Sequence, residues 1–289
     1  MIPIINLLSA IVLPAVSMAA TINPADFQLR PDKTLSGLAS SDVLTRRSAI
    51  HQFVSSLDTK FVKEYDNSLL PVLLASARDS DPEVRYYGLS AARMLAHAVI
   101  LSKGSKDHRI FGRAVSIDFA KEPELLPLFQ KAAKDSDSKI RICGVAALAK
   151  GYPPSADLEK FLITLAQTET DSGVRREIVD GLGAGQYRSS GAVQALTKLL
   201  EDQSEDVRGW AGFFLGQTKS KDSLPALVSK LNDARPFVRE RISSAIGNFG
   251  SDARKYAADL RKTLDQSKDD ASRRALETAI KNVEATKEN

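Results

Sequence analysis

The sequence contains few of the residues from which disulfide frameworks and metal centres are built. Its 289 residues include one cysteine, Cys143, and three histidines, His51, His97 and His108. A single cysteine excludes a disulfide within the chain and every zinc site that needs several thiolates. None of the histidines lies in an H-E-x-x-H motif, and no two of them have metal-ligand spacing on one helical turn. We therefore expect no metal site and no bound cofactor.

A strong excess of charge is also missing. Forty lysines and arginines face thirty-six aspartates and glutamates, which gives a net charge of +4. Proteins that follow nucleic-acid phosphates usually gather their basic residues on one face or in one run. The main concentration here is at residues 103–121, where five basic side chains stand against two acidic ones. This modest excess does not favour a nucleic acid as the partner.

The first twenty residues have no charged side chain. An apolar run at residues 2–16 is followed by small residues, a pattern typical of a secretory signal peptide that is cleaved after Ala19. The basic residues that usually precede such a run are missing, because the first one is Arg30. The run is short for a transmembrane helix and is interrupted by Pro14. We expect a signal peptide at 1–19 and a secreted or periplasmic protein whose mature chain has no membrane span.

Aromatic residues are scarce, at 6% of the chain, whereas hydrophobic residues make up 43% and charged residues 26%. A chain of this composition can bury a large core and is not disordered. The shortage of aromatic residues predicts that the core is packed mainly from small aliphatic side chains.

What the sequence does contain is a segment that recurs about every 33 residues. Each copy has an Asp-rich turn, a β-branched residue, an arginine and then an apolar stripe at helical spacing. A second amphipathic segment precedes each copy, so the repeated unit is a helical hairpin. A hairpin with an apolar face must bury that face against the next hairpin. The seven marker arginines are Arg46, Arg85, Arg141, Arg175, Arg208, Arg239 and Arg273.

These copies resemble the HEAT family, in particular HEAT-like repeats of the phycobilisome-lyase type, whose signature is an Asp-rich turn followed by V-R-x-x-A-x-x-A-L-G. The matching pairs are Val84-Arg85, Ile140-Arg141, Val174-Arg175, Val207-Arg208 and Val238-Arg239. The resemblance implies an all-α fold, a right-handed α-solenoid of about seven stacked hairpins without a sheet. We place the solenoid at residues 40–285, after an N-terminal segment at 20–39 and before a tail at 286–289.

One interval between marker arginines is longer than the others. Arg85 and Arg141 are 56 residues apart, which indicates an insertion at 102–122 between two hairpins. Insertions in solenoids lie on one edge and often carry binding, so Arg109 and Phe111 are candidate partner-binding residues. The alternative is that the insertion folds back over the solenoid and is anchored there by its apolar residues.

A second set of candidates comes from one position of the repeat, two residues after the marker arginine. Tyr87, Trp210 and Arg241 occupy this position, which Cys143 and Glu177 hold in other copies. The resemblance implies that the second helices line a concave face, so we expect these residues to form a partner-binding stripe there. Tyrosine, tryptophan and arginine are common interface anchors. The alternative for Trp210 is that it packs over the next hairpin as part of the core.

No catalytic motif is convincing. Residues 181–185 are rich in glycine but follow a helix, whereas a dinucleotide-binding loop follows a strand. Residues 136–139 match S-x-x-K but lie in a repeat turn, without the companion motifs of that enzyme class. We interpret the marker arginines as structural, because an arginine repeated in every unit can bridge adjacent turns.

The sequence therefore favours a non-catalytic protein-binding scaffold or adaptor of the secreted or periplasmic space, which binds another protein on the concave face of the solenoid. One alternative is a lyase-type or other enzymatic subunit that binds a small molecule, since the HEAT family includes such subunits as well as scaffolds and DNA glycosylases. The other is a nucleic-acid-binding HEAT protein, which requires a cytoplasmic location.

Overall fold

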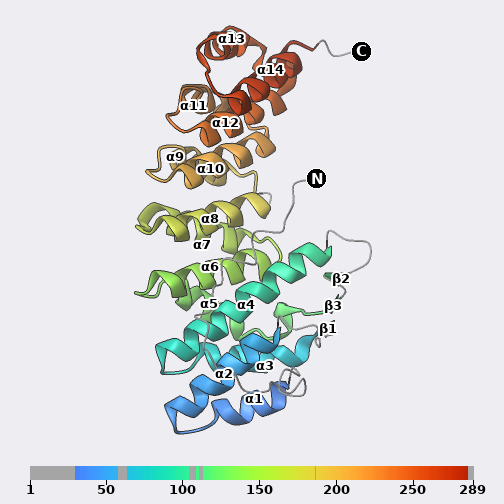
Figure 1. The fold of residues 1–289 in the computed structure, drawn as a ribbon, viewed down its shortest axis with the longest axis vertical. Coiled ribbons are helices and arrows are strands. Elements are labelled where there is room, and N and C mark those ends of the chain that lie inside the picture. The colour runs from blue at the N-terminus through green and yellow to red at the C-terminus, as the bar shows by residue number, and fades with distance from the viewer. Residues whose placement is uncertain (1–29, 58–63, 104–108, 111–112, 186, 286–289) are drawn as a thin grey trace.

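The computed structural model describes residues 30–57, 64–103, 109–110, 113–185 and 187–285 (Figure 1). The predicted signal peptide, the tail and Phe111 lie outside these described residues. The described chain is elongated, with its first helices at one end of the molecule and its last helices at the other (Figure 1).

Fourteen α-helices of the described chain follow one another as seven hairpins that stack into a solenoid (Figure 1). The all-α fold and the seven hairpins are as predicted. The first hairpin uses a helix that lies within residues 20–39, ahead of the predicted start of the solenoid. The hairpins are α1 (Pro31–Leu38) with α2 (Val43–Leu57), α3 (Leu70–Ala77) with α4 (Pro82–Lys103), α5 (Leu125–Ala132) with α6 (Ser138–Gly151), α7 (Ala156–Thr168) with α8 (Ser172–Ala184), α9 (Ser190–Leu199) with α10 (Glu205–Thr218), α11 (Leu224–Ser229) with α12 (Pro236–Asn248), and α13 (Ala257–Gln266) with α14 (Asp270–Glu284).

The Asp-rich turns start the second helix of several hairpins by capping it. In the turn before α8, the Asp171 carboxylate accepts hydrogen bonds from the backbone N–H groups of Gly173 and Val174, at 2.9 and 3.1 Å. Such a cap stabilises a helix by about 1 kcal/mol because it satisfies N–H groups that have no partner within the helix. The equivalent carboxylates in other turns are those of Asp81, Asp137 and Asp269.

The marker arginines connect each turn to the turn of the next hairpin. Arg208 donates from Nη1 to the backbone oxygens of Asp202 and Gln203 in its own turn, at 2.7 and 3.0 Å. It also donates from Nε and Nη2 to both carboxylate oxygens of Asp233 in the next turn, at 2.8 and 3.0 Å. We call this repeated contact the arginine ladder. Its other rungs are Arg46 with Asp79, Arg141 with Glu169, Arg175 with Asp202 and Arg239 with Asp269.

The arginine ladder is interrupted at one place. Arg85 donates to the backbone oxygens of Asp79 and Ser80, at 2.9 and 2.8 Å, but no described carboxylate accepts a hydrogen bond from it. The interruption falls between the second and third hairpins, where the insertion enters the chain. An exposed ion pair between Arg78 and Glu124 joins these two hairpins instead.

Small residues let the second helices approach one another closely. A Cβ atom on Gly216 of α10 would lie 2.7 Å from the backbone of Ala245 in α12, so a larger residue would push these two helices apart. The β-branched residues that precede the marker arginines fill the space between the layers and are all buried: Val84, Ile140, Val174, Val207 and Val238. The core is therefore continuous along the solenoid and consists mainly of aliphatic side chains, as the composition predicts.

The insertion forms a small sheet, which corrects the prediction that the solenoid has none. The strands are β1 (Glu64–Tyr65), β2 (Arg109–Ile110) and β3 (Arg113–Val115), in the order β1-β3-β2. β1 runs parallel to β3, and β2 runs antiparallel to it. Since β1 comes from the segment between α2 and α3, two long connections meet here and satisfy each other's backbone groups.

The end of the insertion is anchored in the core. Phe119 is only 1% exposed, and its ring lies 6.1 Å from those of Phe129 and Tyr152. Ile117 is buried as well. This part of the insertion folds back over the solenoid edge, as the second of the two interpretations proposed.

The arginine ladder leads to a stability prediction. Arg208→Ala should lower the free energy of unfolding by about 1–3 kcal/mol, because the Asp233 carboxylate loses its partner while remaining largely buried. Arg85→Ala should cost about 1 kcal/mol or less, since Arg85 contacts carbonyl groups alone. Urea unfolding monitored by circular dichroism measures both losses. Equal losses for the two variants would show that the carboxylate contacts contribute nothing.

Candidate functional site

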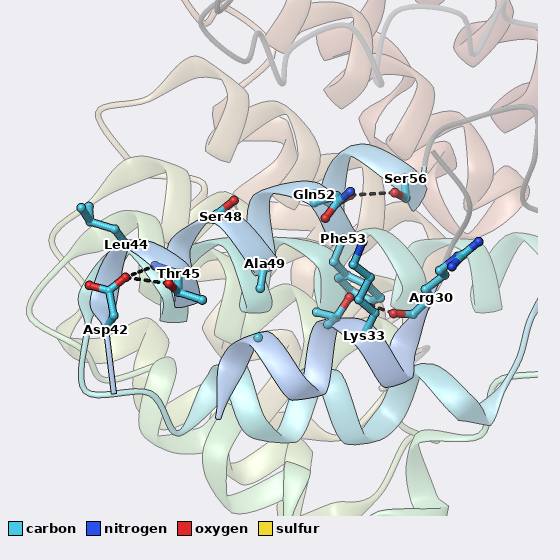
Figure 2. Close-up of a pocket in the computed structure, with 12 residues that line it drawn as sticks. Arg30, Lys33, Asp42, Leu44, Thr45, Ser48, Ala49, Gln52, Phe53 and Ser56 are labelled. Atoms are coloured by element: carbon cyan, nitrogen blue, oxygen red, sulfur yellow. Dashed lines mark hydrogen bonds between the residues drawn. The ribbon is translucent and has the colours of Figure 1, made fainter. Parts of the chain in front are cut away.

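One hollow in the described chain lies at the end of the stack, beside the first hairpin. It has a volume of about 510 Å³ and lies between α1 and α2 (Figure 2). Its polar groups are engaged locally: the Asp42 carboxylate accepts hydrogen bonds from the backbone N–H and the hydroxyl of Thr45, at 2.8 and 2.6 Å. Leu44 on its rim is 68% exposed. The hollow is the uncovered end of the stack, and its lining does not resemble a catalytic site.

The candidate stripe on the second helices is interrupted in the structure. Tyr87, Trp210 and Arg241 are half-buried, on α4, α10 and α12. Cys143 on α6 and Glu177 on α8, which hold the same repeat position, are buried, with 3% and 7% of their surface exposed. The candidates therefore fall into two separate groups, one around Tyr87 and one around Trp210.

The group around Tyr87 joins the first two hairpins. The Tyr87 ring lies 4.1 Å from the ring of His51 on α2, in an edge-to-face arrangement. His51 Nε2 is 3.0 Å from a carboxylate oxygen of Glu83, and Arg47 binds Glu83 and Asp81 at 2.8 Å each. The hydrogen bond from Arg47 lowers the pKa of Asp81 to about 2. Tyr87 thus belongs to a contact that holds neighbouring hairpins together.

Between the two groups, Glu177 is the centre of a charged network. Its carboxylate oxygens lie 2.8 Å from Arg93 Nη2 on α4 and 3.0 Å from Lys150 Nζ on α6. Burial raises the pKa of Glu177, but Lys150 and Arg93 outweigh burial and hold it below its usual value. Burial, with Lys150, lowers the pKa of His97 beside this network. Glu177 therefore stays charged at neutral pH and connects three successive hairpins.

The group around Trp210 combines an aromatic ring with two cations. The guanidinium carbon of Arg176 on α8 and that of Arg241 on α12 each lie 4.5 Å from the centre of the Trp210 ring. α8 and α12 flank α10 in the stack (Figure 1), so the two cations come from the hairpins on either side of the one that carries Trp210. A cation over an indole face is attracted by about 0.5–2 kcal/mol, more as water is excluded. We call these three residues the Arg–Trp–Arg stack.

The two arginines of the stack differ in their partners. Arg176 forms an ion pair with Asp180 on its own helix, at 2.6 Å. Within the described chain Arg241 pairs with no carboxylate, and its buried Nε atom has no hydrogen-bond acceptor. Its further neighbours are the rings of Phe213 and Phe237, each 5.4 Å from the guanidinium carbon. Arg241 is thus a cation held by aromatic rings.

Of the predicted site residues, the structure brings Trp210 and Arg241 together, and Tyr87 lies several hairpins away. Arg109 lies in β2, and nothing is described of its side chain. The sequence did not identify Arg176 as a site residue. The feature that could have pointed to it is the doublet Arg175-Arg176, in which Arg175 belongs to the arginine ladder and Arg176 can reach the next hairpin. The repeat spacing alone did not show that the two arginines meet on the ring between them.

The described residues offer little for covalent or metal chemistry. They include no group of three or more histidine, cysteine or acidic side chains placed to hold a metal ion. Burial raises the pKa of the Cys143 thiol to about 12, so this thiol is protonated at neutral pH and is a poor nucleophile. None of the described helices is long and apolar enough to span a membrane.

The fold and the repeated turns define an α-solenoid built from helical hairpins. Residues 193–281 match a family model described as HEAT repeats. The match covers the last three hairpins, α9 to α14, which are therefore similar to HEAT repeats, and the recurring arginines mark the equivalent turns in the earlier hairpins. No curated protein sequence matches the chain significantly.

Several solved structures have a similar fold. An engineered protein has a TM-score of 0.59 and 19% identity, over 88% of this chain and 68% of that protein. A designed armadillo repeat protein in complex with the peptide (KR)4 has a TM-score of 0.55 and 20% identity, over 76% and 98%. The Escherichia coli protein YibA has a TM-score of 0.54 and 17% identity, over 91% and 95%. At these identities the likeness concerns the fold.

The charged network gives a second stability prediction. Glu177→Ala should lower the free energy of unfolding by about 2–4 kcal/mol, because the largely buried side chain of Lys150 loses its counter-charge. The matched control is Glu205→Ala, which removes an exposed acid paired with the exposed Arg235 and should cost less than about 1 kcal/mol. Urea unfolding of both variants tests this. A loss for Glu177→Ala no larger than that of the control would contradict the structural role of the network.

Proposed function

We propose that this protein is a non-catalytic scaffold that binds a partner protein on the face of its second helices, centred on α8, α10 and α12. The observation that carries the proposal is the half-buried Arg–Trp–Arg stack, which combines the two residue types most enriched at interface hot spots. Because these side chains are already held against one another, a partner that binds them orders few additional rotamers.

The contacts along the second helices support the view that this face is the inner side of a curved stack. Arg93 on α4 pairs with Glu177 on α8, although α6 lies between these two helices. The small residues of α6 on this face, among them Cys143, leave room for that contact. Side chains of alternate hairpins meet more easily on the concave side of a stack than on its convex side.

A similar fold that holds a peptide supports a peptide-like partner. The designed armadillo repeat protein is in complex with a peptide, (KR)4. An extended row of second helices offers an elongated surface along which a peptide or a loop of another protein can lie. We also propose, from the apolar N-terminal run and the small residues at 17–19, that the chain is exported to the periplasm or secreted.

The proposal is tested by photo-crosslinking in intact cells. A photoreactive amino acid replaces Gln217, an exposed residue two helical turns after Trp210 on α10. The control places it at Gln194, an exposed glutamine on α9 of the same hairpin. Position 217 should capture a discrete protein that position 194 does not capture.

The same crosslink should be lost when Trp210→Ala is combined with the photoreactive position 217, in a variant that circular dichroism shows to be folded. Removing a hot-spot tryptophan typically weakens binding by more than about 1 kcal/mol. Identical capture from positions 194 and 217, or capture that persists in the Trp210→Ala background, would show that the partner binds elsewhere.

A further inference from the structure

We propose that the Arg–Trp–Arg stack recognises an acidic peptide segment, in which a carboxylate pairs with Arg241 and adjacent apolar side chains contact the surrounding rings. This inference rests on the proposed function, because it names the chemistry of the partner for the same surface. It goes beyond that function in fixing the sign of the partner's charge.

The first argument is the pairing of the arginines on the second helices. The ladder arginines bind carboxylates of the next turn, Arg93 binds Glu177, and Arg176 binds Asp180. Arg85 and Arg273 have no described carboxylate partner either, but both donate to backbone carbonyl groups. Arg241 differs because it is half-buried and, within the described chain, pairs with no carboxylate and donates no hydrogen bond. Its neighbour in the sequence, Glu240, is half-buried and forms no ion pair with it. An arginine without a counter-charge is the natural binding group for an anion.

The second argument is the way in which Arg241 is held. The rings of Trp210, Phe213 and Phe237 lie 4.5–5.4 Å from its guanidinium carbon. A guanidinium that stacks on rings stays planar and keeps N–H donors at its edge, in a fork that matches a carboxylate. Stacking also removes part of its water in advance, so an ion pair formed there costs less desolvation and less side-chain entropy.

The third argument concerns the surroundings of this cation. Phe213, Phe214 and Phe237 are all half-buried, so each ring retains exposed surface beside the Arg–Trp–Arg stack. Phe213 lies edge-to-face on Trp210, with 5.4 Å between the ring centres. A partner that presents apolar side chains next to its acidic residue buries this surface as the ion pair forms. The surface therefore fits a segment in which acidic and apolar residues alternate.

The charge pattern of this surface also argues against a nucleic acid as its partner. Binding along a phosphate backbone requires several adjacent cations that lack counter-charges. Arg176 is neutralised by Asp180, so the stack offers one unpaired cation, Arg241. One cation among aromatic rings suits a single carboxylate.

Binding can be measured through the fluorescence of Trp210, because it is the only tryptophan of the chain. Its fluorescence is followed while the full-length protein is titrated with an octapeptide of alternating Glu and Leu. Matched peptides replace Glu by Gln or by Lys, and a single-stranded oligothymidylate tests the nucleic-acid alternative. The Glu peptide should produce a saturable change that weakens as sodium chloride is added, and it should bind at least about tenfold more tightly than the Lys peptide.

Two variants test whether Arg241 is the residue that binds the carboxylate. Arg241→Gln should raise the Kd of the Glu peptide about tenfold. Arg235→Gln removes an exposed cation at the start of the same helix and should change that Kd by less than about twofold. Circular dichroism melting confirms that both variants are folded.

The outcomes separate this inference from the proposed function. Equal binding of the Glu, Gln and Lys peptides would leave a binding face in place but overturn its preference for acidic segments. Tighter binding of the Lys peptide or of the oligothymidylate, an unchanged Kd in Arg241→Gln, or no binding of any probe would each overturn the inference. The crosslinking experiment at position 217 tests the scaffold function independently of these peptides.

Discussion

The contact made by the arginine at the fourth residue of the second helices is the interaction on which the rest of the structure depends. The guanidinium binds the carbonyl groups of its own turn and the carboxylate of the next turn, as Arg208 does with Asp202 and Asp233. That carboxylate also accepts a backbone N–H, since Asp233 binds the amide of Arg235 at 2.9 Å. One side chain therefore joins two turns and fixes the register between neighbouring hairpins.

This register determines which side chains meet along the second helices. Residues at the same distance from the marker arginine come to the same height, which places Trp210 beside Arg241. Small residues provide the space for the aromatic rings. A Cβ atom on Gly209 would collide with the Phe237 ring, and one on Gly183 would collide with the Phe214 ring. The aromatic surface thus depends on glycines that belong to the neighbouring helices.

The sequence predicted the hairpins well because two independent periodicities agree, the helical spacing of the apolar residues and the recurrence of the marked turns. It failed where the local signal is short. Strands of two or three residues, such as β1 and β3, are too short to show an alternating pattern. The sequence did not predict that the segment at 31–38 is the first helix of a hairpin, because only Thr34 and Leu38 in it are buried.

The candidate site was predictable in part. The repeat position of Trp210 and Arg241 follows from the sequence, but the burial of Glu177 at the equivalent position does not. That burial requires two cations from other hairpins, Arg93 and Lys150, which lie 84 and 27 residues away along the chain. Pairing of this kind depends on how the hairpins stack, which the local spacing of residues does not specify.

The most direct test of the central claim is whether Trp210 lies partly exposed in a positively charged environment. Because Trp210 is the only tryptophan, quenching of its fluorescence by iodide and by caesium reports on this one site. We expect that iodide, an anion, quenches more efficiently than caesium at low ionic strength, and that Arg241→Gln reduces this difference. Quenching by caesium equal to or greater than that by iodide, or no quenching by either ion, would contradict the claim.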